Sequence, residues 1–320
     1  MINGQRLFVE IIKRYCAERG IALDIRADGW LLVLDRGSQR HLILGYDLGL
    51  NSSVAHRIAS DKSATAELLA LSGIACVPHA FFLGPQAGPR APLAPMLRLL
   101  DAHPEGLVVK PNEGTSGRLV FRAAARDSLA RAVDAIFAAN MNVAIAPYLS
   151  IDDEVRVVLL DGTPLVVYAK QRIAVIGNGR QTFRELALGA TPLARHVELI
   201  DNLRAETDES DLDAIVPLGA QRLLNWRHNL EFGARAVLLD AGEIRDICVA
   251  LSIAATDALG IRFASVDLVR AHDRWQVLEI NSGVVMEQFG RQHPELVDAI
   301  YTAALDSVFG EAAGSDRPAM

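Results

Sequence analysis

Residues 265–281 have the sequence SVDLVRAHDRWQVLEIN, in which two apolar segments flank a short polar turn. This pattern predicts a β-hairpin. Alternate residues of a strand share a face, so Glu279 and Asn281 point the same way, and the turn brings Asp267 back beside them. The surrounding residues are apolar, so these carboxylates interrupt a buried sheet, where an unpaired charge is costly. The hairpin therefore predicts three oxygen ligands directed at one point.

Two carboxylates and an amide oxygen suit Mg²⁺, with Mn²⁺ as an alternative, because such an ion keeps several waters and completes its shell with nucleotide phosphates. The alternative interpretation is that Asp267 and Glu279 are edge-strand charges that face water. We favour a catalytic metal site formed by Asp267, Glu279 and Asn281, since apolar residues surround all three.

Residues 107–120, LVVKPNEGTSGRLV, predict a strand, a glycine-bearing loop and a returning strand over 119–122. Gly114 and Gly117 let the backbone approach a phosphate closely and present its N–H groups. Lys110 at the strand end would supply a positive charge. Glycine turns between strands are common and need bind nothing. Together with the metal hairpin, however, this loop favours a nucleotide cleft.

The composition indicates a globular chain of two or three lobes: it has 320 residues, 51% of them hydrophobic. Its net charge of −7 argues against a nucleic-acid partner. Cys16, Cys76 and Cys248 are far apart in apolar surroundings, which predicts buried free thiols in a reducing compartment. The first residues lack the apolar core of a signal peptide and no apolar run reaches the length of a membrane span, so we expect a cytoplasmic protein.

Periodicity predicts alternating helices and strands in an α/β (α+β) chain. Residues 1–60 form a small N-terminal α/β lobe, with a helix over 5–19 and strands over 22–25, 31–34 and 42–46. Residues 61–149 form a central lobe that contains a Pro/Gly-rich loop at 84–95. Residues 150–309 form a C-terminal lobe that carries a hairpin (154–160 and 165–171) and the metal site, and 310–320 is a disordered tail.

Four blocks of residues, in this order and at this spacing, resemble the ATP-grasp carboxylate-amine ligases. The resemblance covers roughly residues 48–290 and favours the branch of cyanophycin synthetase and the ATP-grasp half of bifunctional glutathione synthetases. It implies the ATP-grasp fold, in which two lobes enclose the nucleotide between antiparallel sheets. The blocks are ASDK (59–62) with GI (73–74), VKP (109–111) with 114–117, APYL (146–149) with EVR (154–156), and Asp267 with EIN (279–281).

The resemblance assigns roles to individual residues. It implies that Lys110 and the backbone of Gly114, Thr115, Ser116 and Gly117 hold the triphosphate. The Pro147 carbonyl and the Leu149 N–H, on either side of Tyr148, would contact adenine, and Glu154 the ribose. Lys62 matches a lysine near the nucleotide, although a solvated lysine at a helix start is an equal alternative. These assignments use the residues of the four blocks only.

Three further cations, Lys170, Arg172 and Arg227, are implied to stabilise the transferred phosphoryl group and the substrate carboxylate. Arg156 is either a fourth such group or the ion-pair partner of another residue in its hairpin. Glu231 and Phe232 replace the small hydroxyl residues that are common in the turn after Arg227. This departure leaves the acceptor pocket undefined.

The implied function is ATP-dependent ligation of small-molecule carboxylate and amine substrates, amino acids or short peptides, through an acyl phosphate, with release of ADP and phosphate. A phosphotransferase or acyl-phosphate hydrolase would need the same metal residues. A non-catalytic nucleotide-binding partner would be expected to have lost one of Lys110, Asp267, Glu279 or Asn281, and none is lost. A thiol acceptor in place of the amine and a homodimeric state both stay open.

Overall fold

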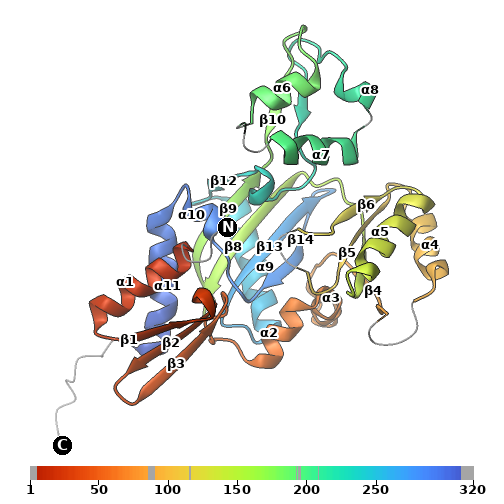
Figure 1. The fold of residues 1–320 in the computed structure, drawn as a ribbon. Coiled ribbons are helices and arrows are strands. Elements are labelled where there is room, and N and C mark those ends of the chain that lie inside the picture. Colours follow the sequence, from red (N-terminus) through yellow and green to blue (C-terminus); the bar gives the residue numbers. More distant parts are fainter. Residues whose placement is uncertain are drawn as a thin grey trace, which may run out of the picture. The chain divides into compact units, whose positions relative to one another are not determined.

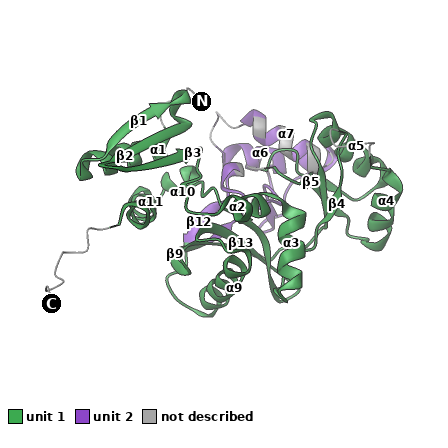
Figure 2. Cartoon of the chain, turned by 90° about the horizontal axis from the view of Figure 1, so that it is seen from below, with its two compact units in different colours: residues 1–168, 238–320 green, residues 169–237 purple. Residues whose placement is uncertain are grey.

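The computed structural model describes residues 6–85, 91–114, 117–191, 193, 196–207 and 209–310, and these form two compact units. Unit 1 contains residues 1–168 and 238–320, and unit 2 contains residues 169–237 (Figure 2). The predicted tail after Gly310 lies outside the described residues. The lobe boundaries predicted at 60 and 149 stay predictions, and no sequence signal predicted unit 2 as separate from the C-terminal lobe.

The N-terminal part of unit 1 pairs one helix with a three-stranded antiparallel sheet (Figure 1). Helix α1 (Leu7–Arg19) buries its apolar side chains and ends at Gly20, whose left-handed backbone (φ 64°) suits glycine. The strands are β1 (Ala22–Arg26), β2 (Leu31–Arg36) and β3 (Gln39–Leu44), in that order. Strand β3 was predicted at 42–46, but Gly45, with φ 64°, ends it.

Two helices link this lobe to the four-stranded sheet that follows. Helix α2 (Ser53–Ser60) begins at Ser52, whose hydroxyl accepts from the Ala55 N–H at 3.1 Å. Helix α3 (Lys62–Leu71) begins at Asp61, whose carboxylate accepts from the Ala64 N–H at 2.8 Å. Both are N-caps of the usual kind, and they fix where Lys62 enters the structure.

A four-stranded sheet, in the order β4-β7-β5-β6, forms the next layer. Its strands are β4 (Ala80–Phe82), β5 (Leu107–Pro111), β6 (Phe121–Ala123) and β7 (Val143–Pro147). Leu107, Val109 and Ile145 join one hydrophobic core with α4 (Leu93–Ala102) and α5 (Arg126–Ala138). Lys110 alternates with Val109, so it lies on the opposite face from these helices.

Two predictions for this layer were wrong. The segment 84–95 was predicted as a loop, yet α4 begins at Leu93; residues 86–90 lie outside the described part. The strand predicted at 119–122 begins at Phe121 because Leu119 has a positive φ of 55°, which does not fit a strand.

A five-stranded sheet, in the order β12-β9-β8-β13-β14, carries the predicted metal hairpin. Its strands are β8 (Asp153–Leu160), β9 (Thr163–Gln171), β12 (Arg235–Leu238), β13 (Phe263–Ala271) and β14 (Arg274–Asn281), and helix α9 (Glu243–Leu259) packs on β8, β13 and β14. Residues 75–77 extend it beyond β14, since the Val77 N–H donates to the Val277 carbonyl at 2.9 Å. Helices α10 (Glu287–Gly290) and α11 (Pro294–Phe309) follow, and α11 packs on α1.

Unit 2 has its own small core, formed by seven buried residues that include Val175, Phe183 and Leu224. Its elements are β10 (Ala174–Ile176), β11 (Gln221–Leu223), α6 (Phe183–Gly189), α7 (His196–Glu206), α8 (Glu209–Leu212) and the short helix Leu230–Phe232. Strands β10 and β11 pair antiparallel.

The three cysteines are free thiols, as predicted, and Cys16 and Cys248 are buried. Burial raises the pKa of Cys16 to about 11 and that of Cys248 to about 12, so both stay protonated at neutral pH. Among the described residues, every helix is too short or too polar to cross a bilayer.

Candidate active site

The hairpin β13–β14 places the three predicted metal ligands on one face, as the sequence predicted. Asp267 lies directly opposite Glu279, and Ser265 lies opposite Asn281. The register shifts between Asp267 and Leu268, so that Leu278 is an extra residue in β14 at this point. A bulge of this kind bends a strand and redirects its side chains.

The donor set suits a hard cation that keeps some of its water. Asp267 is 1% exposed, whereas Glu279 and Asn281 are only partly buried, and the Asn281 amide donates to Glu279 Oε1 at 3.3 Å. No group of three or more His, Cys, Asp or Glu side chains suited to a metal occurs in the described part of the chain. A protein-only cage is therefore not built here. Two carboxylates and one amide fit Mg²⁺ that is shared with phosphate oxygens.

Arg156 occupies the position next to Asp267 in the same row of the sheet. Strand β8 pairs Arg156 with Asp267, and β14 pairs Asp267 with Glu279. Arg156 Nε donates to Asp267 Oδ1 at 2.6 Å, and Nη2 donates to Oδ2 at 2.6 Å. Burial by itself would lower the pKa of Arg156, but the Asp267 carboxylate more than offsets this and holds that pKa above its ordinary value. Arg156 thus forms an ion pair, but its partner lies in β13 and not in its own β8–β9 hairpin, where the ion-pair alternative had placed it.

Lys110 is the second-to-last residue of strand β5 and is 6% exposed. Burial, opposed by the negative charge of Glu279 and reinforced by the positive charge of Lys62, lowers the pKa of Lys110 to about 8. An anion such as a phosphate would stabilise the charged form of a buried ammonium group that has a second one nearby. This environment fits the predicted contact with phosphates.

Lys62 is held against the glycine loop. Its Nζ donates to the Gly114 carbonyl at 2.7 Å, and its backbone N–H donates to the Asn112 carbonyl at 3.2 Å. Burial lowers the pKa of Lys62, although Glu279 partly opposes this. The alternative of a solvated lysine is therefore wrong: Lys62 is a partly buried cation that joins α3 to the loop.

The glycine loop itself is described at Gly114 and Gly117 but not at Thr115 and Ser116, which lie outside the described residues. A Cβ on Gly114 would come within 2.9 Å of Pro111, so no larger residue fits without a shift. Gly117 has φ 68°. Both glycines are required by the backbone here, whatever the loop binds.

Asn112 and His79 border these lysines and were not predicted. Asn112 is fully buried, and its Oδ1 accepts from the Ser63 N–H at 3.2 Å and from the Ser63 hydroxyl at 2.9 Å. His79 Nδ1 lies 2.9 Å from the Val77 carbonyl, so Nδ1 carries the proton and Nε2 is an acceptor. Burial, with Lys110 and Lys62 nearby, lowers the pKa of His79 to about 2. Only the spatial neighbourhood identifies these two residues, and single-sequence patterns do not carry it.

The predicted adenine segment follows strand β7. The Tyr148 N–H donates to the Gly106 carbonyl at 3.0 Å, and the Arg122 guanidinium lies 3.8 Å from the centre of the Tyr148 ring. Leu149 packs beside Val77 and Ala146. Glu154 is buried in β8, opposite Val269. Pro147 is the last residue of β7 and pairs with Leu107.

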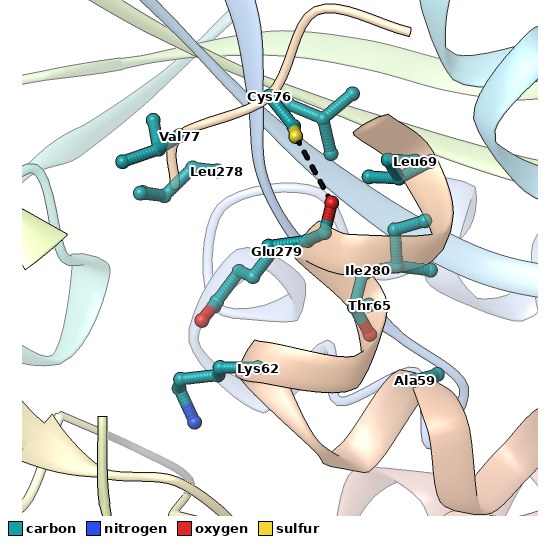
Figure 3. A pocket seen from close by; sticks show the side chains of 11 residues that line it. Ala59, Lys62, Thr65, Leu69, Cys76, Val77, Leu278, Glu279 and Ile280 are labelled. Atoms are coloured by element: carbon teal, nitrogen blue, oxygen red, sulfur yellow. Dashed lines mark hydrogen bonds between the residues drawn. The ribbon is translucent and has the colours of Figure 1, made fainter. Parts of the chain in front are cut away.

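A small pocket lies between α3 and β14, with Lys62 and Glu279 among its lining residues (Figure 3). Its cavity volume of ≈ 10 Å³ is about the space of one water molecule. Cys76 also lines it and donates its thiol to the Ala66 carbonyl at 3.4 Å. This pocket is therefore too small to hold a substrate and lies at the edge of the site that contains Lys62 and Glu279.

The cations Lys170, Arg172 and Arg227 belong to unit 2 or to the strand that enters it. Lys170 is buried, and its carbonyl accepts from His228 Nδ1 at 2.9 Å. The Arg227 N–H donates to Asn225 Oδ1 at 2.8 Å, and its guanidinium lies 5.2 Å from the centre of the Trp226 ring. These contacts order the turn on which Arg227 lies; its role toward a substrate stays a prediction.

Similar architectures occur among solved structures. A bifunctional glutathione synthetase from Pasteurella multocida matches with a TM-score of 0.54 and 16% identity over 94% of this chain. A D-alanine–D-alanine ligase from Bacillus anthracis matches with a TM-score of 0.51 and 17% identity, over 81% of this chain and 72% of that one. The chain has the ATP-grasp fold.

The predicted ATP-grasp fold is therefore confirmed. The chain spans 45% of the length of the glutathione synthetase, so that protein contains a large region without a counterpart here. A scan against family models found no match, and a search of curated proteins found no relative. At these identities the likeness concerns the fold, and the ATP-grasp residues named above carry the functional argument.

Proposed function

We propose that this protein is an ATP-dependent ligase that joins a small carboxylate to an amine, with amino acids or short peptides as substrates. One observation supports the proposal: within unit 1, a row of two carboxylates lies near a buried lysine, Lys110, and a partly buried one, Lys62, as an anionic nucleotide with its metal requires. Asp267 and Glu279 form the acidic row, and both lysines, Lys62 and Lys110, are influenced by the charge of Glu279.

The bound Mg²⁺ would neutralise phosphate charge and orient the triphosphate. Glu279, Asn281 and Asp267 would hold it, Lys110 and the glycine loop would hold the phosphates, and Glu154 and the 147–149 segment would hold the nucleoside. Lys170, Arg172 and Arg227 would stabilise the negative charge that develops at the transferred group. These assignments follow the ATP-grasp resemblance.

The chemistry requires two displacements. A carboxylate oxygen attacks the γ-phosphorus, the bond from that phosphorus to the bridging oxygen breaks, and ADP leaves. The amine nitrogen then attacks the acyl carbon, the carbon–oxygen bond to phosphate breaks, and the amine loses a proton. No protein nucleophile is needed, so positioning and charge stabilisation account for catalysis.

A substrate screen tests the proposal. The purified protein with MgATP is incubated with pairs of amino acids and short peptides, ADP release is measured, and products are identified by mass. We expect ADP release that depends on the carboxylate, with an amide product for at least one amine. ADP release with phosphorylated or hydrolysed carboxylate, and no amide with any amine, would favour a phosphotransferase or acyl-phosphate hydrolase instead. A thioester product would show that the acceptor is a thiol and would leave the rest of the proposal unchanged.

A further inference from the structure

Three Arg–Asp pairs bridge strands β8 and β13 or their ends. Arg262 Nε donates to Asp161 Oδ1 at 2.7 Å, and Arg270 Nε donates to Asp153 Oδ2 at 2.9 Å. The third pair is Arg156 with Asp267. The side chains of Arg262 and Asp161 are 48% and 45% exposed and those of Arg270 and Asp153 are 32% and 41% exposed, whereas those of Arg156 and Asp267 are 18% and 2% exposed. Exposed ion pairs contribute little to the stability of the fold. The buried pair, Arg156 with Asp267, is therefore the one with a role to explain.

The buried pair occupies both oxygens of a carboxylate that the metal would use. Two parallel N–H···O bonds of 2.6 Å hold Asp267 in a single orientation. A divalent cation that approaches Asp267 would meet the guanidinium charge at close range. It would also compete with two charge-assisted hydrogen bonds at a buried carboxylate, where like charges repel more strongly than in water.

The neighbouring charges act in the same direction. Burial lowers the pKa values of Lys62 and Lys110, and the negative charge of Glu279, the second carboxylate of the row, raises them. Each carboxylate of the row therefore has cations beside it before any ion binds. A nucleotide brings several negative charges and reverses this balance, because its phosphates attract both the lysines and a divalent cation.

We propose that Arg156 is a positioning residue that holds Asp267 as its counter-ion and prevents the acidic row from binding a free divalent cation. The metal then enters only with the nucleotide. This inference rests on the proposed metal–nucleotide site and adds the order in which its components bind. In this proposal Arg156 acts only through Asp267 and does not contact the reacting atoms.

The test measures binding of Mn²⁺ from the loss of the free-ion electron paramagnetic resonance signal. The variants are wild type, Arg156→Gln and, as a matched control, Arg262→Gln, which removes an exposed bidentate Arg–Asp pair from the same two strands. Without nucleotide, we expect Arg156→Gln to bind Mn²⁺ at least about tenfold more tightly than wild type, because the competing cation is gone. Arg262→Gln should match wild type. Adding Asp267→Asn to Arg156→Gln should abolish the gain.

A second measurement covers the case in which Arg156→Gln does not fold. Arg156→Lys keeps the charge but loses the fork, and it should bind Mn²⁺ alone with an affinity above that of wild type. In metal-free buffer its Tm should be below that of wild type, and Mn²⁺ alone should raise the Tm of the variant but not that of wild type. Equal affinity of wild type and both Arg156 variants for Mn²⁺ alone would overturn the inference.

The result with nucleotide distinguishes the two proposals. In the presence of a non-hydrolysable ATP analogue, wild type and Arg262→Gln should bind Mn²⁺ tightly. If wild type binds no Mn²⁺ even with the analogue, the proposed metal–nucleotide function fails. If it binds equally well with and without the analogue, only the inference about Arg156 fails.

Discussion

Lys110 lies in an environment that differs clearly from water. Its ammonium group is buried near Lys62, which lowers its pKa to about 8, while Glu279 partly compensates. Phosphates that bind beside it would favour the charged form and raise that pKa. Nucleotide binding and protonation of Lys110 are therefore linked.

The linkage predicts a pH dependence of nucleotide affinity. Below about pH 8 Lys110 is already charged and affinity is at its maximum; above that pH, affinity falls because binding must first return a proton to Lys110. Calorimetry of an ATP analogue at pH 9 in buffers of different ionisation enthalpy should show proton uptake. Lys110→Arg stays charged and should lose both effects. Proton release at pH 9, or an affinity that rises with pH, would contradict this role.

Lys110 and Arg227 should affect different kinetic constants. Lys110 would face phosphates that are charged in the ground state, so Lys110→Ala should mainly raise KM for ATP. Arg227 would meet charge that develops at the transferred group, so Arg227→Ala should mainly lower kcat. Steady-state kinetics of carboxylate-dependent ADP formation measure both. An increase in KM alone for Arg227→Ala would remove Arg227 from the chemistry.

At the scale of elements, the hairpin β13–β14 shows what a single sequence predicts well. Its alternation, its turn and its apolar surroundings are local properties, and they predicted that Asp267 and Glu279 share a face, which the register confirms. Arg156 illustrates the limit. Its partner is 111 residues away and is set by the pairing of β8 with β13, so the sequence left its role open.

Other features were left open for related reasons. Residues 75–77 pair with β14, whereas β4 begins at Ala80 and pairs with β7, and which sheet a short segment joins is a tertiary property. Helices α6 to α8 pack around a core of their own in unit 2, and no local boundary signal separated that unit from the rest. His79 and Asn112 were not predicted because only the folded structure shows that they lie near Lys62 and Lys110.

The same hairpin carries a prediction about metal binding. Glu279→Gln and Asn281→Ala should each lower turnover by at least about a hundredfold with the fold retained, because each removes an oxygen ligand or its charge from the proposed ion. The control is Asp273→Asn in the turn of this hairpin, where the carboxylate side chain is 94% exposed. Circular dichroism checks the fold. Near wild-type turnover of both site variants at saturating Mg²⁺ would exclude the metal assignment.

At the scale of the whole molecule, the residues with proposed roles are distributed over both units. Unit 1 contains the acidic row, Lys62, Lys110 and the segment predicted to contact adenine, whereas unit 2 contains Arg172 and Arg227, and the Arg227 N–H donates to Asn225 Oδ1. Under the proposed function, the first set would bind the nucleotide and the second set would meet the carboxylate substrate. The identity of that carboxylate depends on loops whose pattern carries no single-sequence signal.

If the carboxylate is activated as an acyl phosphate, one of its oxygens must pass to the released phosphate, and heavy-oxygen labelling detects that transfer. A carboxylate substrate labelled with ¹⁸O is converted with ATP and the amine, and the released phosphate is analysed by mass spectrometry. The account predicts one labelled oxygen in each phosphate and ADP as the nucleotide product, because the attacking carboxylate oxygen stays on phosphorus when the amide forms. Phosphate without label, or AMP with pyrophosphate as products, would contradict it.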